Sequence, residues 1–231
     1  MSQLRETSVT SVTQAGEPRR RMAAADRREA ILAAALDAFA EGGYHETSLE
    51  DVAERAAISK ALIYEHFGSK RELHDALLET YVAELIGTVA EATAAAEPGE
   101  QRLRAGLDGF LGFVERRRDA WRMLVRNTAD ADIATSVERV RHEAAGAITA
   151  LMVADAPPGS PVEGVERELA VEMLAQQLVG AAQSLANWWD EHRDLPRGRV
   201  LAIAMDFAWV GLERVGEGET WQGGDALPEI G

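Results

Sequence analysis

The sequence predicts an all-α fold, in which a few short helices near the amino terminus precede a larger helical body. Apolar residues recur at three- and four-residue intervals over most of the 231 residues, and this is the spacing of one face of an α-helix. No stretch shows the strict two-residue alternation that is typical of a half-buried β-strand. Proline and glycine pairs fall between the amphipathic stretches, where they end helices.

The chain begins with residues that we expect to form a flexible leader, residues 1–22. Residues 1–16 are rich in Ser, Thr and Gln and lack an apolar run, so no signal peptide is expected. The leader ends in Arg19-Arg20-Arg21. This cluster is either a solvated tail or an arm that contacts phosphates or enters a minor groove. Residues 26–40 predict the first helix, which the following glycine pair should end.

Two short amphipathic helices joined by a tight turn are predicted in residues 48–67. The first has apolar residues at positions 49, 52, 53 and 56, and Ser48 can cap its start. The pattern is interrupted at positions 57 and 58. Ser59 can then cap a second helix that places Ile63 and Phe67 on one face. This arrangement is that of a helix-turn-helix.

Residues 28–73 resemble the amino-terminal DNA-binding domain of the TetR family of transcriptional regulators. The resemblance rests on a whole string of residues at fixed spacing: Ile31-Leu32, Ala35, Phe39, Gly42-Gly43-Tyr44, Thr47-Ser48, Asp51-Val52-Ala53, Ile58-Ser59-Lys60, Ile63-Tyr64, His66-Phe67, Ser69-Lys70 and Leu73. The sequence departs from the family in two places. Ala57 replaces a turn glycine, and Ala61-Leu62 replaces a pair of small residues that opens toward DNA. If residue 57 needs a positive φ, alanine is strained there.

The resemblance implies that side chains around the second short helix contact double-stranded DNA. The candidates are Thr47, Ser48, Ser59, Lys60, Ala61, Leu62, Tyr64, His66 and Lys70. Lys60 is expected to contact a phosphate, and Leu62, if it faces outward, a thymine methyl group. The implied operator is palindromic, because a symmetric dimer presents two heads to successive major grooves.

The charge distribution is compatible with this hypothesis although the chain is acidic, with a net charge of −15. Residues 19–75 contain nine Arg and Lys against eleven Asp and Glu, whereas residues 76–231 contain fourteen against twenty-six. DNA affinity depends on local phosphate contacts more than on the charge of the whole chain. The balance therefore favours a sequence-specific DNA-binding protein over a non-specific one.

The body is predicted to consist of further helices, the first of which joins it to the head. That helix covers residues 70–96 and ends before Pro98-Gly99. The others are predicted at residues 101–118, 121–126, 133–154, 163–191 and 198–215. We therefore expect a DNA-binding head at residues 23–72, a ligand-binding and dimerisation body at 73–215 and a loose tail at 216–231.

Apolar, aromatic and amide side chains of the body predict a small-molecule cavity. The candidate ligand-binding residues are Phe110, Phe113, Trp121, Leu124, Asn127, Met173, Gln177 and Trp188, and Leu174 and Leu178 are further apolar candidates for the wall. The TetR resemblance implies an effector within this body, and the shortage of cations in the candidate wall favours a small apolar or aromatic molecule. It also implies a homodimer through the last two long helices. Small residues there, including Gly180 and Gly211, suit close helix packing between subunits or within one chain.

No catalytic, metal or cofactor site is predicted. The sequence has no GxSxG, GxGxxG, P-loop or HExxH motif, and its five histidines lack a chelating spacing. Cysteine is absent, which excludes disulfides and thiolate chemistry. No run of eighteen apolar residues exists, so no contact with a membrane is expected and a cytoplasmic location is inferred.

The leading hypothesis is a homodimeric, ligand-responsive transcriptional regulator, a repressor that its effector releases from the operator. The first alternative is a helical ligand-binding protein that acts through a protein partner without specific DNA binding. Glu65 on the recognition helix, Ala57 in the turn and the acidic charge support it. The second alternative, a cofactor-free helical enzyme, has no motif in its favour.

Overall fold

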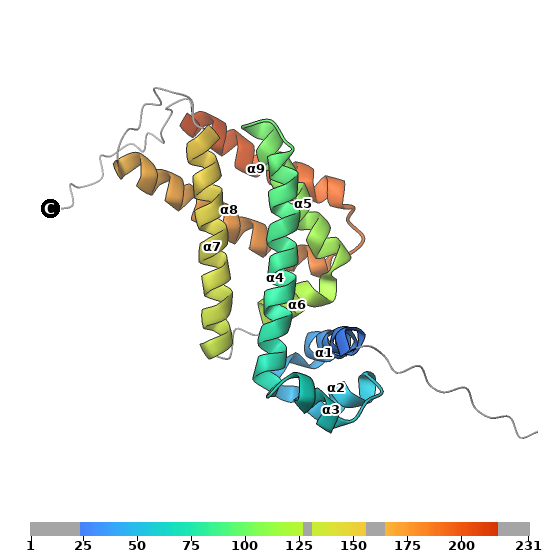
Figure 1. The fold of residues 1–231 in the computed structure, drawn as a ribbon. Helices are drawn as coiled ribbons and strands as arrows, with labels where there is room; N and C mark the ends of the chain where they lie inside the picture. Colours follow the sequence, from blue (N-terminus) through green and yellow to red (C-terminus); the bar gives the residue numbers. More distant parts are fainter. Residues whose placement is uncertain (1–23, 127–130, 156–164, 217–231) are drawn as a thin grey trace, which may run out of the picture.

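The computed structural model describes residues 24–126, 131–155 and 165–216, and every element in these ranges is an α-helix (Figure 1). The all-α prediction is confirmed. The helices are α1 (Ala24–Glu46), α2 (Leu49–Arg55), α3 (Lys60–His66), α4 (Lys70–Ala94), α5 (Glu100–Arg116), α6 (Arg118–Arg126), α7 (Ala131–Asp155), α8 (Val165–Glu191) and α9 (Arg197–Gly216). None of them is long and apolar enough to cross a membrane within the described ranges. The predicted leader with Arg19-Arg20-Arg21, and the tail beyond residue 216, lie outside the described residues.

Helix α1 is longer than predicted, because its glycine pair bends the helix and does not end it. Gly43 has φ 77° and ψ 170°, far from helical values, and the chain then resumes helical geometry up to Glu46. Glycine tolerates this conformation because it has no Cβ. The helices of the body differ from their predicted bounds by three residues or fewer.

Each of the three helices that follow α1 begins at a serine N-cap. The Ser48 hydroxyl accepts a hydrogen bond from the Asp51 amide (3.1 Å), while the Asp51 carboxylate accepts one from the Ser48 amide (2.8 Å). Ser59 and Ser69 accept in the same way from the amides three residues later, at 3.3 and 3.0 Å. The starts of α2, α3 and α4 are therefore fixed by local hydrogen bonds that the sequence encodes directly.

The turn between α2 and α3 contains the strained residue that the sequence suggested. Ala57 has φ 52° and is the one non-glycine residue with a positive φ in the described part of the chain. The Ala57 amide donates to the Glu54 carbonyl (3.1 Å), and the Ile58 amide donates to the Ala53 carbonyl (3.0 Å). The turn thus needs a left-handed residue, and alanine adopts this conformation at a cost.

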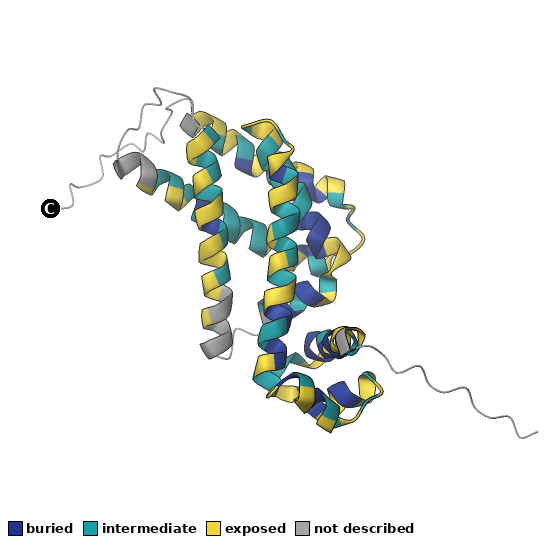
Figure 2. Ribbon diagram, viewed as in Figure 1, coloured by how far each residue is buried: buried dark blue, intermediate teal, exposed yellow. Residues whose placement is uncertain are grey.

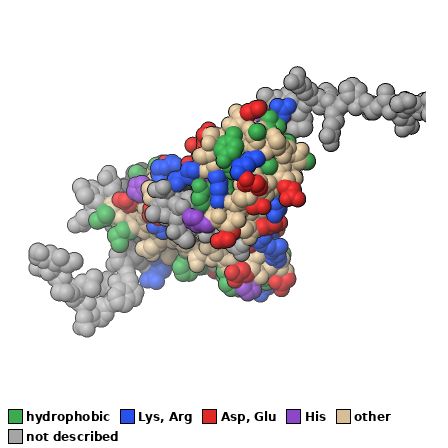
Figure 3. Space-filling view, turned by 90° about the horizontal axis from the view of Figure 1, so that it is seen from below, with side chains coloured by type: hydrophobic (Ala, Val, Ile, Leu, Met, Phe, Trp, Pro, Cys, Tyr) green, Lys and Arg blue, Asp and Glu red, His purple; other side chains and the backbone are tan. Residues whose placement is uncertain are grey.

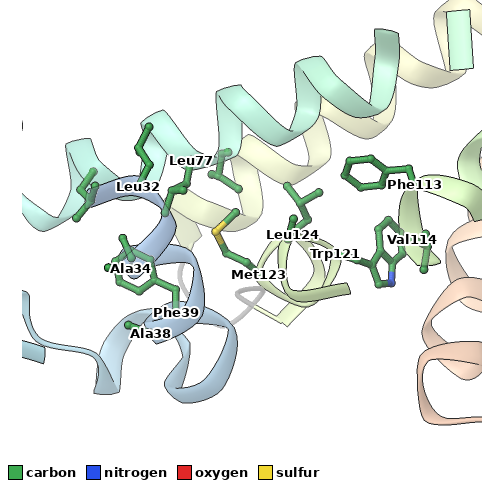
Figure 4. Packing of buried hydrophobic residues seen from close by; sticks show 14 of the residues in the cluster. Leu32, Ala34, Ala38, Phe39, Leu77, Phe113, Val114, Trp121, Met123 and Leu124 are labelled. Carbon is green, nitrogen blue, oxygen red and sulfur yellow. The ribbon is translucent and has the colours of Figure 1, made fainter. Parts of the chain in front are cut away.

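Buried side chains join the head to the body without a break. In the head, Phe39 of α1 and Ile63 of α3 are buried in the core between α1, α2 and α3. Leu77 of α4 continues this core toward the body. Met123 of α6 is also fully buried and extends toward Leu77 and the α1 side chains (Figure 4). Helix α1 therefore packs against both α4 and α6. Figure 2 shows dark-blue buried residues at this junction, whereas α7 is mostly intermediate or exposed.

The far half of α4 is packed closely against α5. A Cβ added at Gly106 would lie 3.1 Å from the Thr93 side chain, and one added at Gly109 would lie 3.3 Å from Ala92. Larger side chains at these glycines would push the two helices apart. The body end of α4 is thus held by α5, while its other end belongs to the head.

We expect Ala57→Gly to raise the free energy of unfolding by about 0.5–1 kcal/mol, because relief of left-handed strain exceeds the entropic cost of glycine. Chemical denaturation measures this change. Ala56→Gly is the matched control, since Ala56 has an ordinary φ of −76° and should lose stability when replaced. Destabilisation by both substitutions would contradict the strain at residue 57.

Candidate nucleic-acid interface and ligand cavity

Helix α3 presents one side to solvent and packs the other against the head. Ile63 and Phe67 are buried. The residues of this segment that were predicted to contact DNA are exposed or half-exposed: Ser59, Lys60, Ala61, Leu62, Tyr64 and His66. The structure therefore brings these six side chains to one end of the molecule, on the surface of the head. Leu62 is half-buried, so its contact with a thymine methyl group stays a prediction.

Lys60, the first residue of α3, forms an ion pair with Glu50 of α2. Its ammonium group also lies 6.0 Å from the centroid of the Tyr64 ring. The hydrogen bond with Glu50 raises the pKa of Lys60 and lowers the pKa of Glu50. Lys60 is therefore charged, but a carboxylate of the same chain already binds it.

Lys70 stands at the first position of α4 and also has partners in the head. Its ammonium group donates to the His45 carbonyl (3.2 Å) and lies 4.5 Å from the centroid of the Tyr44 ring. Partial burial lowers the pKa of Lys70. The amine is half-exposed, so it remains on the surface that includes α3.

Thr47 was predicted to contact DNA, but its side chain is buried inside the head. Its side chain is only 5% exposed, and its hydroxyl lies 3.0 Å from the Ala38 carbonyl and 2.8 Å from the Gly43 carbonyl. Because the hydroxyl donates to the α1 backbone, Thr47 fastens α1 to α2 and does not face DNA. The neighbouring Ser48 takes the capping position and stays half-exposed.

A half-open cavity of about 1360 Å³ lies in the body between α4, α5 and α7, with further walls from α6, α8 and α9. Most of the lining is apolar, with Leu78, Val89 and Ile148 among its members. Lining residues on α4 extend from Asp75 to Ala94. At 1.5 Å per residue this corresponds to about 28 Å of helix. The cavity is therefore long as well as large.

Of the predicted ligand-binding residues, Phe110, Trp121 and Leu124 line this cavity. The other described ones do not: Phe113 is fully buried elsewhere in the core, and Met173, Gln177 and Trp188 are exposed on α8. Asn127 lies outside the described residues.

Met173, Gln177 and Trp188 were wrongly predicted to line the cavity, because they lie on the side of α8 that faces away from it. The cavity side of α8 includes Val171, together with Leu174 and Leu178, which were among the apolar candidates of the sequence. Apolar residues occur on both sides of α8, so its spacing did not reveal which side faces inward. Trp209 of α9 was also missed, although a tryptophan inside an amphipathic helix is a signal that could have suggested it.

One polar part of the cavity lies where the α4–α5 turn meets the end of α7, and Asp75, Glu79, Arg139 and Arg141 are further charged lining residues. Arg102 forms an ion pair with Asp155, and both side chains are largely buried. The Gly99 amide also donates to Asp155 (3.3 Å), and Arg102 donates to the Ala96 carbonyl (3.2 Å). These contacts attach the carboxyl end of α7 to the turn. Elsewhere in the described residues, no three His, Asp or Glu side chains come together as a metal site would require.

Helix α6 connects the cavity to the rest of the molecule. The Trp121 ring packs edge-on against Phe110 (centroids 5.4 Å apart), and its indole N–H donates to the Asn187 side chain of α8 (3.1 Å). Arg122 makes two hydrogen bonds to Asp190 of α8, at 2.7 and 3.2 Å. Helix α6 therefore lines the cavity, packs against α8 and, through the buried Met123, packs against the head.

Comparison with known proteins gives matches over both the head and the body. Residues 31–77 match the model of the tetR family of bacterial regulatory proteins, and residues 99–211 match a tetracyclin repressor-like carboxy-terminal domain. The chain is 31% identical over 193 residues to the HTH-type transcriptional activator FasR of Mycolicibacterium smegmatis, covering 82% of this chain and 84% of that protein. It is 38% identical over 96 residues to an HTH-type transcriptional repressor of Mycobacterium tuberculosis, covering 38% and 51%.

The fold is also similar to solved structures. The crystal structure of a TetR-like transcriptional regulator from Rhodococcus sp. RHA1 superposes with a TM-score of 0.70 at 27% identity. The match covers 84% of this chain and 99% of that one. Head and body are therefore arranged as in a protein of this kind.

Proposed function

The chain belongs to the TetR family of DNA-binding transcriptional regulators, and we propose that it acts as a homodimer whose operator binding is controlled by an elongated apolar molecule in the body cavity. The observation that carries this proposal is helix α6, which forms part of the cavity wall and also packs against the head through Met123. A ligand that contacts α6 can therefore act on the head directly.

The size and lining of the cavity support a long apolar effector. Ligand pockets for drug-sized molecules have volumes of about 300–1,000 Å³, and this cavity of about 1360 Å³ is larger. Its polar lining residues are few beside the apolar ones, and they include Gln183 of α8, the Arg102–Asp155 pair beside the α4–α5 turn, and Asp75, Glu79, Arg139 and Arg141 on α4 and α7. A chain or a fused-ring molecule with few polar atoms suits such a wall better than a compact polar one.

Two helices would transmit ligand binding to the head. Helix α4 is continuous from the Ser69 cap to the far end of the cavity. Helix α6 contacts α1 through Met123 and is attached to α8 through Arg122. If the ligand displaces Trp121, α6 and α1 must move together, because Met123 is fully buried between them. The ligand shifts the equilibrium only if it binds one arrangement of the heads more tightly than the other.

Gly87 is a soft point in α4 between the part held by α5 and the part held by the head. A Cβ at Gly87 would meet no atom within 4 Å, so no packing requirement explains the glycine. Glycine inside a helix weakens it by about 1 kcal/mol relative to alanine. Bending at Gly87 would let the head tilt while Thr93 stays packed against α5.

The exposed sides of α8 and α9 support a homodimer. Met173 and Trp188 of α8, with Ile203, Phe207 and Val210 of α9, leave 47–75% of their surface exposed, and Phe207 is the most exposed of them. Apolar patches of this kind mark interaction sites on soluble proteins. Gly180 and Gly211 also face open space. By contrast, Ala208, another small residue of α9, is buried within its own chain.

Release from the operator on ligand binding is the mechanism that we propose, which makes the protein a repressor. Activation is the second candidate, because FasR, which matches 82% of this chain, is named an activator. A reporter gene placed behind an operator selected from random DNA distinguishes the two. Expression that falls when the protein is present without effector supports repression, and expression that rises supports activation.

We expect Ile148→Trp to block the cavity, because the larger side chain occupies space lined by α4 and α7. Binding of Nile red, an uncharged apolar dye, should weaken by at least about tenfold in a fluorescence titration. The control is His142→Trp, an exposed position on the same helix that does not line the cavity. Equal dye binding by both variants and the wild type would contradict the proposed ligand site.

We expect Gly87→Ala to raise the free energy of unfolding by about 1 kcal/mol and to reduce the effect of ligand on operator affinity. Gly146→Ala on α7 is the matched control, because an added Cβ there also meets nothing within 4 Å. It should stabilise α7 similarly and leave the ligand response unchanged. A normal ligand response in the Gly87 variant would show that α4 does not bend at this residue.

A further inference from the structure

Three cations of the head are bound by carboxylates of the head itself. The cross-element and intrahelical pairs are Arg55 with Glu41, Lys60 with Glu50 and Arg71 with Asp75. Viewed from the head's end of the molecule, the Lys and Arg side chains of the described residues are interspersed with Asp and Glu side chains and form no continuous basic patch among them (Figure 3). A DNA phosphate that approaches Arg55, Lys60 or Arg71 therefore meets a cation that is already paired with a carboxylate.

The Lys60–Glu50 pair differs from the other two in its position. It joins the start of α3 to the start of α2, and Lys60 is the cation of the α3 surface that the family resemblance places against phosphate. The Lys60 side chain is 41% exposed and that of Glu50 is 63% exposed. Exposed pairs contribute little to stability. The main consequence of this pair therefore concerns what Lys60 can bind.

We propose that Glu50 is an internal competitor for DNA phosphate, a carboxylate that holds Lys60 in the free protein and must be displaced whenever Lys60 contacts a duplex. Displacement leaves Glu50 without its cation and close to a phosphate of the same charge, and both effects oppose binding. Glu50 thus sets the DNA affinity of the head although it forms no favourable contact with DNA.

The same exchange of partners changes the salt dependence of binding. A lysine that neutralises a phosphate normally releases counterions, and each such contact contributes about −0.9 to the slope of log K against log salt. Here the phosphate replaces a carboxylate, and the freed carboxylate attracts a cation in turn. Lys60 should therefore add little to the slope while Glu50 is present, and its full contribution should appear when Glu50 is neutralised.

The test uses the full-length protein and a duplex of mixed sequence, so it does not depend on the identity of the operator. Affinity is measured between about 50 and 200 mM salt. Glu50→Gln should raise affinity at the lowest salt by about fivefold or more and steepen the slope by about 0.9 for each bound head. Glu54→Gln is the matched control, because Glu54 is an exposed carboxylate one turn later on α2 and its loss changes the net charge equally.

A double-mutant cycle separates competition from a general charge effect. In a Lys60→Gln background, Glu50→Gln should do no more than Glu54→Gln does. Equal effects of Glu50→Gln and Glu54→Gln with Lys60 intact would overturn the proposal, because net charge alone would then explain the change. A full Glu50→Gln effect in the Lys60→Gln background would also overturn it, because Glu50 would then act on DNA without Lys60. Thermal unfolding of each variant, followed by circular dichroism, verifies that the head stays folded.

Discussion

The packing of Met123 between α6 and the head is the constraint on which the rest of the structure depends. Met123 is fully buried, and its helix has only nine residues, with Trp121 and Leu124 lining the cavity. Close-packed interiors do not deform continuously. A displacement of α6 must therefore move α1 with it or open a void beside Met123. The hydrogen bonds of Arg122 to Asp190 hold the other side of α6 to α8.

This constraint assigns different tasks to the two helices that run between head and body. In the proposed switch, helix α4 limits how far the head can tilt, because α5 holds its far half at Gly106 and Gly109. Helix α6 would start the tilt, because its short length places the cavity wall and the head contact within a few residues of each other. A switch of this type has two packed arrangements that a ligand can distinguish. The exposed apolar side chains of α8 and α9 would join two such units, so that the tilt changes the spacing of the heads.

The sequence predicted the head better than the body, for physical reasons that particular residues illustrate. Serine caps and the turn at Ala57 depend on interactions within three or four residues, so the string from residue 47 to residue 70 was sufficient to predict them. Thr47 could not be placed in the same way, because its hydroxyl donates to a carbonyl nine residues earlier. The extension of α1 past Gly43 was missed because glycine both ends helices and permits kinks.

In the body, the sequence predicted the helices but not which side of each one faces inward. Alanine and other apolar residues occur all round α8, so Met173 and Leu174 were equally plausible cavity residues. Tertiary packing exposes Met173 and turns Leu174 inward. The Arg102–Asp155 pair connects residues 53 positions apart and has no local signal at all.

The distance between the two heads of the proposed dimer, measured with and without an effector identified by thermal-shift screening, tests the central claim most directly. The chain contains no cysteine, so a single cysteine introduced at the exposed Glu54 of α2 can carry a spin label in each subunit. Double electron–electron resonance then reports the label separation. The structure predicts that saturating effector shifts this distance and lowers operator affinity together. An unchanged distance while operator affinity falls would contradict transmission through α6 and α4.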